Sequence, residues 1–344
     1  MVKNFPPGKI PVDVLRTIVF EHLGTQNPRL LLAPGIGEDA AIIKMNGKVI
    51  VVTSDPITGS LESIGWLSVH INANDIATCG AIPLWYLTTI LLPEKTEIDH
   101  RKMLGQITSQ IDAASKELNI TVAGGHTEIT PGISRPIVVG FMVGETEKDN
   151  YVTSNGAKPG DKIIITKSVG LEGTSILAEE METILKENLE DSVILQAKEF
   201  IKKISVVKDA QIAMSVGGVN AMHDPTEGGI FLGLHEIADA SHIGLQIEEA
   251  LIPIAHETEA ICEFFEIDPF QLISSGCLII SASPEKTPMI VEQLESENIA
   301  AVIVGEFVSD PQIRKILTKE NNYRDLLRPA SDHLWRALEQ VFKK

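Results

Sequence analysis

Hydrophobic residues in the first half of the chain follow two spacings. A spacing of three to four residues, typical of an amphipathic helix, runs through residues 11–24. Two apolar runs, at 40–44 and 48–53, flank Asn46-Gly47, a pair that favours tight hairpin turns, so we expect antiparallel strands there. The same two patterns predict helices at 61–79 and 99–118, and strands at 85–92, 121–123 and 136–144.

The pattern breaks near residue 150. Residues 150–162 are rich in turn formers and poor in apolar residues, so we predict an N-terminal domain of residues 1–150 and a C-terminal domain of residues 151–344. Helices and hairpins mix in the first domain, which favours the α+β class over a doubly wound sheet. In the second domain we predict strands at 163–166, 219–223, 277–282 and 301–305, and helices up to 187 and at 228–240, 256–264 and 285–297.

Composition narrows the range of partners. The 344 residues are 44% hydrophobic and 22% charged, which is typical of a globular protein long enough for two cores. Acidic residues number 47 against 29 lysines and arginines, a net charge of -18, so nucleic acid and anionic membranes are excluded as expected partners. Nucleotides are not excluded as ligands, because Mg²⁺ can bridge the carboxylates of the protein and the phosphates of the nucleotide.

The three cysteines form no pattern. Cys79, Cys262 and Cys277 are far apart in sequence, which indicates neither a disulfide framework nor a zinc site and fits a reducing cytoplasm. No apolar run approaches 18 residues and the first residues lack a hydrophobic leader segment. We therefore expect a soluble cytoplasmic protein.

Two acidic residues stand beside turns. Asp39 follows a glycine-rich turn in which Gly35 and Gly37 let backbone amides approach an anion while the carboxylate offers oxygen to a metal. Asp55 follows an apolar strand, so its side chain would emerge at the rim of a sheet. Taken singly, an ordinary solvated loop explains the first and an Asp-Pro turn explains the second.

A third acid lies on a predicted helix. Asn72 and Asp75 are three residues apart and therefore share one face, in apolar surroundings where polar groups need partners. Together with Asp39 and Asp55, Asp75 would form an oxygen-rich cluster able to hold Mg²⁺. The chain has no G-x-x-x-x-G-K-[ST] motif, so phosphate would be held through the metal.

Two further segments carry candidate chemistry. Gly124 and Gly125 would end a strand and bring backbone amides close to a ligand, with His126 and Glu128 emerging at its end as catalytic candidates; a structural role for both is the alternative. Asp224 precedes a Gly-Gly pair and a predicted helix. Helix capping by Asp224 or Thr226 and phosphate binding at the helix start both explain that segment.

These motifs, in this order, resemble one superfamily over nearly the whole chain. The set comprises G-I-G-E-D-A-A at 35–41, T-S-D at 53–55, N-D-I-A at 74–77, G-A-I-P at 80–83, G-G-H-T-E at 124–128, K-P-G-D at 158–161 and H-D-P-T-E-G-G at 223–229. It is similar to the aminoimidazole ribonucleotide synthetase (PurM-like) superfamily. That superfamily includes thiamine-monophosphate kinase, selenophosphate synthetase and the hydrogenase-maturation factor HypE, and this chain most resembles HypE and its paralogues.

The resemblance implies an architecture and a chemistry. It implies an α+β N-terminal domain that dimerises through barrel-forming strands, followed by an α/β C-terminal domain, with ATP in the cleft between them. Asp39, Asp55 and Asp75 match positions that hold Mg²⁺ and phosphate, and Lys3 and Lys9 are candidates for contacting phosphate. The expected reaction is ATP-dependent phosphorylation or dehydration of an unidentified small molecule by a homodimer, with a maturation protein as a further partner.

Three differences between this chain and the members of that superfamily leave other functions open. HypE is expected to end in a cysteine that receives a carbamoyl group, whereas no cysteine follows Cys277 here. Glu227 stands where the superfamily usually has an arginine, and His126 stands where thiamine-monophosphate kinase has an aspartate. The alternatives are therefore a nucleotide-binding partner or regulatory protein that has lost the reaction, or a small-molecule kinase.

Overall fold

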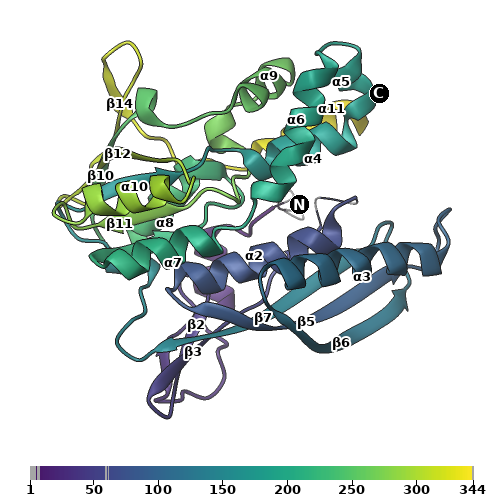
Figure 1. Ribbon diagram of the computed structural model, residues 1–344, viewed down its shortest axis with the longest axis horizontal. Coiled ribbons are helices and arrows are strands. Elements are labelled where there is room, and N and C mark those ends of the chain that lie inside the picture. The colour runs from purple at the N-terminus through teal and green to yellow at the C-terminus, as the bar shows by residue number, and fades with distance from the viewer. Residues whose placement is uncertain (1–4, 6–7, 59, 61, 343–344) are drawn as a thin grey trace.

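Two α/β layers are stacked on each other in the computed structural model, which describes residues 5, 8–58, 60 and 62–342. Figure 1 shows the N-terminal sheet below and the C-terminal sheet with its helices above, with α2 (Ile64–Thr78) and α7 (Val207–Val216) where the two meet. The chain thus has the two-domain fold of mixed α and β content that the sequence predicts. No helix in the described ranges is both long and apolar enough to cross a membrane.

The first sheet takes its strands from residues before 148. Its order is β1 (Leu30–Leu32), β2 (Ala41–Met45), β3 (Lys48–Thr53), β7 (Ile137–Glu147), β5 (Ile82–Pro93) and β6 (Thr121–Thr130), with β4 (Pro56–Ile57) paired to β7. All pairs are antiparallel except β5 and β6, which α3 (His100–Glu117) connects. Helices α2 and α3 cover one face of this sheet (Figure 1).

The predicted hairpin is confirmed. Strands β2 and β3 pair antiparallel with Ala41 opposite Val52, and both turn residues, Asn46 and Gly47, have positive φ. This is the conformation that matches the twist of two-residue hairpins. The register of the pair places Asp39 just before β2 and Asp55 just after β3, so the hairpin brings its two ends together.

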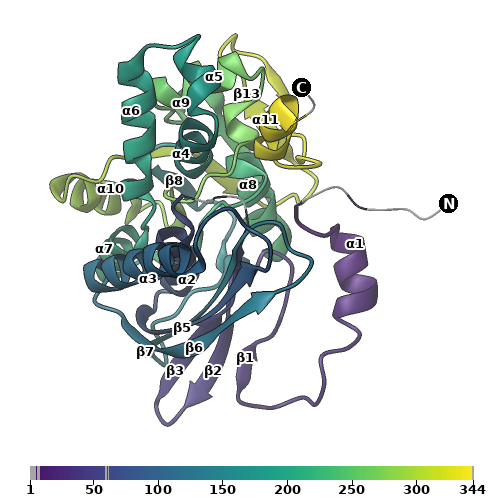
Figure 2. The ribbon, with the colours of Figure 1, turned by 90° about the vertical axis from the view of Figure 1, so that its right-hand side faces the viewer.

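The predicted helix at 11–24 is wrong in its extent. Only α1 (Val12–Val14) and a π-helical turn (Leu15–Val19) form, and Figure 2 shows α1 at the edge of the molecule, away from the other helices. The apolar residues Ile18, Val19 and Leu23 are about half exposed. Helices in proteins gain most of their stability from packing of an apolar face, and this one has no cover within the described chain.

The predicted end of β6 is also wrong. The strand continues through Gly124 and Gly125 to Thr130 rather than stopping at 123, with a bulge that leaves Ala123 without a partner in β5. A Cβ on Gly125 would lie 2.0 Å from the Thr88 carbonyl oxygen. The second glycine therefore allows β6 to pair closely with β5, and does not end the strand.

The second sheet has strands only from residues after 161. Its order is β14 (Tyr323–Asp325), β13 (Arg314–Leu317), β10 (Gly244–Glu248), β12 (Ala301–Val308), β8 (Lys162–Thr166), β11 (Ile279–Ala282) and β9 (Val219–His223). Its remaining helices are α4 (Leu171–Glu180), α5 (Glu182–Lys186), α6 (Asp191–Glu199), α8 (Gly229–Ala240), α9 (His256–Phe264), α10 (Thr287–Ser296) and α11 (His333–Phe342). The sequence patterns missed β10, β13, β14, α6, α7 and α11.

Helix α2 forms the seam between the domains. Nearly every one of its residues is buried, because the first sheet packs on one side and α7 and β9 pack on the other. A helix enclosed on all sides needs no polar face. The polar residues it does carry, Asn72, Asn74 and Asp75, are therefore buried at the domain boundary, where each needs a partner.

Candidate functional site

Thr53, the last residue of β3, joins two of the predicted metal ligands. Its hydroxyl oxygen lies 2.8 Å from Asp75 Oδ2 and 3.0 Å from the main-chain oxygen of Asp39. Thr78, one turn further along α2, donates a hydrogen bond to Asp39 Oδ2 at 3.3 Å. The hairpin end and the helix thus hold Asp39 and Asp75 side by side.

Asp55 is fixed beside the same helix by its backbone. Its amide nitrogen donates to Asn72 Oδ1 at 3.0 Å, and the Asn72 amide group also donates to the Ser68 carbonyl oxygen at 2.9 Å. Asn72 is therefore committed to positioning Asp55. The predicted cluster of Asp39, Asp55 and Asp75 does come together in space.

Burial and mutual repulsion make it costly for all the carboxylates of this cluster to be charged at once. Burial, reinforced by the charges of Asp55 and Asp39, raises the pKa of Asp75 well above its ordinary value. Burial likewise raises the pKa of Asp55, and the Asp39 charge adds to the effect. A cation bound here would favour the charged form of each carboxylate, and so offset both the burial and the mutual repulsion that raise these pKa values.

His223 supports the cluster from the C-terminal domain. It ends β9, with Nδ1 at 2.8 Å from Asp39 Oδ2 and Nε2 at 2.9 Å from Glu236 Oε2. Burial lowers its pKa, but the two carboxylates outweigh burial and raise the pKa to about 10, so the imidazole is charged. Lys9 Nζ lies 3.3 Å from Glu236 Oε1, which brings the predicted Lys9 to the site; Lys3 lies outside the described residues.

Asn74 connects Asp224 to the domain seam. Its amide nitrogen donates to Asp224 Oδ2 at 2.8 Å and to the Ile204 carbonyl oxygen at 2.9 Å, while its oxygen accepts from the Val206 amide at 2.8 Å. The other carboxylate oxygen of Asp224 is buried and has no partner among the described residues. Burial raises the pKa of Asp224 to about 7.

The capping alternative for Asp224 and Thr226 is wrong. Helix α8 begins at Gly229 with Gly228 as its N-cap, and no side chain of the segment caps it. The Gly228 amide instead donates to Asp332, which arrives from the far end of the chain. Asp224 is thereby left facing the acid cluster.

The glycine-rich turn packs against a helix. Gly37 has a φ of 78°, and a Cβ there would lie 2.9 Å from the Glu236 carbonyl oxygen on α8. Gly35 allows the Glu38 side chain to fold back over the turn. Gly37 therefore allows the Asp39 loop to lie close to Glu236, where His223 can reach Asp39.

The structure does not bring His126 and Glu128 to the cluster. Both lie on β6, the edge strand on the opposite side of β7 and β5 from β3. Their side chains are 67% and 48% exposed, and His126 Nε2 contacts Glu128 Oε2 at 3.2 Å. Gly124 and Gly125 share this edge, away from the Asp39 loop. Any catalytic role of this strand stays a prediction.

Magnesium fits the donor chemistry of the cluster. Within the described ranges, no group of three or more His, Cys, Asp or Glu side chains is arranged so that it could hold a metal ion by itself. Mg²⁺ does not require one, since it is commonly held by one or two carboxylates together with water and substrate phosphates. The unpartnered oxygen of Asp224 and the carboxylates of Asp39, Asp55 and Asp75 supply the oxygen atoms it prefers.

A cavity of about 450 Å³ lies between the domains beside this cluster. One acid of the cluster, Asp55, lines it together with three other acids, and Lys9 is its one basic lining residue in the described chain. The lining also includes Gly8, Pro56, Ile57, Thr58, Ser60, Leu67, Ile71, Glu172, Ile176, Thr226, Glu227, Ile273, Ser275, Asp332, Leu334 and Trp335.

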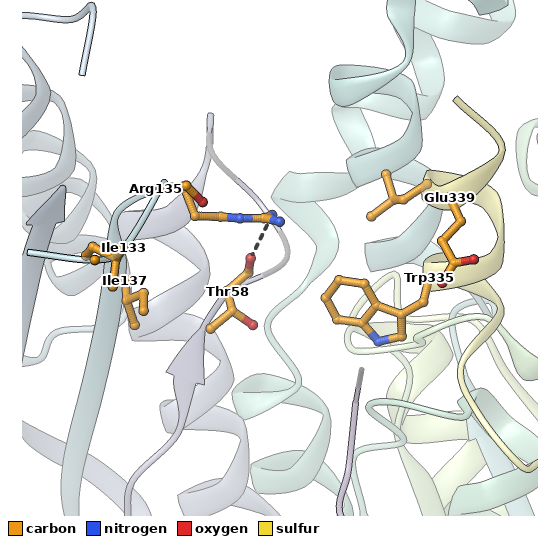
Figure 3. Close-up of a pocket in the computed structure, with 9 residues that line it drawn as sticks. Thr58, Ile133, Arg135, Ile137, Trp335 and Glu339 are labelled. Atoms are coloured by element: carbon orange, nitrogen blue, oxygen red, sulfur yellow. Dashed lines mark hydrogen bonds between the residues drawn. The ribbon is translucent and has the colours of Figure 1, made fainter. Parts of the chain in front are cut away.

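An open groove of about 480 Å³ adjoins the cavity and shares Thr58 and Trp335 with it. In Figure 3 the Trp335 ring extends from α11 toward Thr58, whose carbonyl oxygen accepts a hydrogen bond from Arg135 at 3.3 Å. Arg135 belongs to the loop between β6 and β7. The groove and the cavity thus lie on either side of Thr58 and Trp335.

Sequence patterns missed the supporting residues of this site. His223 was visible only as the neighbour of Asp224, and Asn74 only as part of a motif. Glu236, Glu172 and Asp332 had no local signal, because none of them belongs to a sequence motif that points to metal or phosphate binding. A charged residue on a mostly apolar helix such as α8 is the one hint that Glu236 offered.

Family models match both domains. Residues 37–146 match the N-terminal domain, and residues 158–317 the C-terminal domain, of AIR synthase related protein. The chain belongs to the AIR synthase related family. This confirms the superfamily to which the ordered motifs pointed.

Relatives of the family include hydrogenase-maturation proteins. Carbamoyl dehydratase HypE of Rhizobium leguminosarum bv. viciae is 29% identical over 284 residues, covering 80% of this chain and 78% of that protein. Hydrogenase expression/formation protein HupE of Azotobacter chroococcum is 28% identical over 287 residues, covering 80% of each.

Solved structures agree in fold. HypE in a HypE–HypF complex superposes with a TM-score of 0.74 at 22% identity, covering 92% of this chain and 99% of that one. HypE in complex with ATP gives 0.71 at 23% identity, covering 96% and 97%. The AIR synthase related chain therefore has the two-domain PurM-like fold.

Proposed function

We propose that this AIR synthase related protein binds Mg²⁺-ATP in the interdomain cavity and uses it to phosphorylate, or thereby dehydrate, a small molecule. The observation that carries the proposal is the meeting of Asp39, Asp55 and Asp75 near Thr53, beside the cavity that Asp55 lines. Phosphoryl transfer depends on positioning and charge neutralisation more than on covalent help from the protein. Clustered carboxylates that hold Mg²⁺ supply both.

The charge of the cavity supports a metal-bound nucleotide. Lys9 is its one basic lining residue in the described chain, and Lys9 already contacts Glu236 through Nζ and Glu227 through its backbone amide. A free triphosphate would be repelled by the surrounding acids. Magnesium bound by the cluster reverses the sign of the local charge and gives the phosphates a ligand.

The acceptor is inferred to be a small molecule and not a cysteine of this chain. The HypE relatives are named carbamoyl dehydratases, and HypE has been solved with ATP. Here Cys79, Cys262 and Cys277 are all buried, and burial raises the pKa of each thiol well above its ordinary value. A buried neutral thiol neither reaches the cavity nor acts as a nucleophile.

An ATP-binding protein without turnover is the second candidate. Glu227 lines the cavity, and its carboxylate accepts from the Lys9 backbone amide at 2.7 Å. Glu227 therefore adds negative charge at a place where a phosphate would need a donor. ADP release separates the two candidates.

The proposal further includes that two copies of this chain form a homodimer and that the chain contacts a maturation protein. Ile82 and Trp85 on β5 and Phe141 on β7 have exposed side chains, and so do Val122 and Ile129 on the edge strand β6. Exposed apolar faces and open strand edges favour association. The solved HypE–HypF complex supports a maturation protein as a further partner.

The test compares nucleotide binding by the full-length protein with that of Asp39→Asn and Asp75→Asn variants. We expect both substitutions to weaken Mg²⁺-ATP binding by more than about tenfold in calorimetry, because each removes a carboxylate from the metal. Asp112→Asn, which changes an exposed acid paired with Lys116 on α3, serves as the control. Unaltered ATP affinity in both cluster variants would exclude these residues from the site.

The same samples decide between the two candidate functions. ADP release is followed with Mg²⁺-ATP alone and with a pool of cellular small molecules. Stimulation by the pool, absent in Asp75→Asn, supports the enzyme. Tight ATP binding with no ADP release under either condition supports the binding protein.

A further inference from the structure

One wall of the interdomain cavity has polar atoms that the proposed ATP site does not use. We call Glu172, Ser275, Asp332 and Trp335 the C-terminal wall; all four line the cavity. Glu172 and Ser275 are only 4% and 0% exposed, and neither Glu172 Oε2 nor Ser275 Oγ forms a hydrogen bond of normal geometry within the described residues, although the Ser275 hydroxyl is close enough to Glu172 to lower the pKa of its carboxyl. Trp335 Nε1 also lacks one in that part of the chain. Buried polar atoms are rarely left unpaired, so several on one wall point to a ligand.

The backbone holds this wall rigidly. Glu172 stands in the first turn of α4, and the Gly173 amide donates to the Ile273 carbonyl oxygen at 3.1 Å. Gly170, just before α4, donates to Ser274 Oγ at 2.8 Å. These two bonds fasten the segment that carries Ser275 to the start of α4. The unpartnered atoms therefore keep their positions without a ligand, which lowers the entropic cost of binding one.

The wall carries two buried acids, Glu172 and Asp332, which are largely or partly protonated near neutral pH without a ligand, and its described lining residues include no free cation. Burial, reinforced by the charges of Asp224 and Asp332, raises the pKa of Glu172 to about 8. Burial raises the pKa of Asp332 to about 7, and the Glu227 charge adds to this. Lys9, the basic residue of the lining, is bound to Glu236. A ligand that brings positive charge and N–H donors would satisfy what these acids lack.

We propose that the C-terminal wall binds the acceptor substrate through a cationic nitrogen group, an ammonium or guanidinium. Glu172 pairs with the cation, the Ser275 hydroxyl accepts one further N–H, and Trp335 Nε1 donates to an oxygen atom of the same ligand. This inference rests on the proposed function, because Asp55 lines the same cavity as this wall and an acceptor bound there would share the cavity with the metal-bound ATP. Its carbon body meets the apolar part of the lining, which comprises Ile57, Leu67, Ile71, Ile176, Ile273 and Leu334.

The test uses methylguanidinium as a probe of the wall. The dissociation constant is measured by ligand-observed NMR on the full-length protein near neutral pH, for the wild type and for Glu172→Gln, Ser275→Ala and Glu285→Gln. Glu285 is an exposed acid outside this cavity and controls for loss of overall charge. Tetramethylammonium, a cation without N–H groups, and methylurea, which has N–H groups but no charge, are measured alongside.

We expect Glu172→Gln to weaken methylguanidinium binding by about tenfold or more and Ser275→Ala by a few-fold, with Glu285→Gln unchanged. The wild type should bind both reference compounds about tenfold more weakly than methylguanidinium. Equal binding by wild type and Glu172→Gln overturns the inference. The inference is also overturned if methylurea binds as tightly as methylguanidinium, which shows that charge plays no part. Equally tight binding of tetramethylammonium overturns it too, because it shows that N–H donation plays no part.

Mg²⁺-ATP binding in the same samples separates this inference from the proposed function. Glu172→Gln and Ser275→Ala should still bind Mg²⁺-ATP, because the proposed metal ligands Asp39, Asp55 and Asp75 are unchanged, and this binding shows that both variants are folded. A wild type that binds Mg²⁺-ATP but not methylguanidinium overturns the wall's role alone. A wild type that binds methylguanidinium but not Mg²⁺-ATP leaves the wall's chemistry in place and overturns the proposed function.

Discussion

Replacing Glu172 with glutamine should stabilise the ligand-free protein in a pH-dependent way. The side chain is buried, and its pKa is raised from 4.5 to about 8. Between pH 4.5 and about pH 8 the folded protein holds a proton on Glu172 that the unfolded chain has already released. Proton binding therefore favours the folded state, and the wild type loses stability as the pH rises through this range. Glutamine has nearly the same shape and no charge, so the variant does not undergo this loss.

The size of the effect follows from the pKa difference. A change from 4.5 to about 8 corresponds to about 5 kcal/mol at 1.4 kcal/mol per pKa unit. Relaxation and water entry around a buried ion reduce this figure, so we expect the variant to be more stable by about 2–4 kcal/mol above pH 8. Below pH 4.5 the two proteins should be equally stable, because the glutamate is protonated in both states.

Urea unfolding followed by tryptophan fluorescence measures the difference. Free energies of unfolding are compared at about pH 5 and about pH 9 for wild type, Glu172→Gln and Glu187→Gln, an exposed control. Taking the difference between variants cancels the titration of groups that do not interact with Glu172, such as His223, and leaves the titration of Glu172 together with its coupling to Asp224 and Asp332. A gap between wild type and Glu172→Gln that is the same at both pH values would refute the reasoning that burial raises the pKa.

Two further substitutions test how the site is held. Asn74→Ala should lower the free energy of unfolding, measured by urea unfolding, by about 3–5 kcal/mol. The reason is that three buried hydrogen bonds at the domain seam, one of them to Asp224, lose their partner. A loss below about 1 kcal/mol would contradict that role. Gly125→Ala should cost at least about 2 kcal/mol more than Gly124→Ala in the same measurement. Both glycines have a φ of 154°, but only at Gly125 would the added Cβ meet the Thr88 carbonyl oxygen. Equal losses of unfolding free energy in the two variants would rule out the close approach of β5 and β6 as the reason that residue 125 is a glycine.

Local chemistry made part of the site predictable. The hairpin follows from Asn46-Gly47 because its turn conformation depends on those two residues alone. Once β2 and β3 pair, Asp39 and Asp55 must lie near each other, and helical spacing puts Asp75 on the same side of α2 as Asn72. The three acids could therefore be chosen from sequence, and the family models confirmed the superfamily that the motifs indicated.

Tertiary structure decided everything that depends on a distant neighbour. The same Gly-Gly pair that suggests a strand end instead lies within β6, because Thr88 of the neighbouring strand, 37 residues earlier, leaves no room for a side chain at Gly125. His223, Glu236 and Lys9 join one charged network only because three separate elements meet at the Asp39 loop. The altered pKa of Glu172 arises from burial against a loop a hundred residues away. The sequence by itself determines which acids this protein has and where its turns form, whereas burial and long-range packing determine which of those acids are charged.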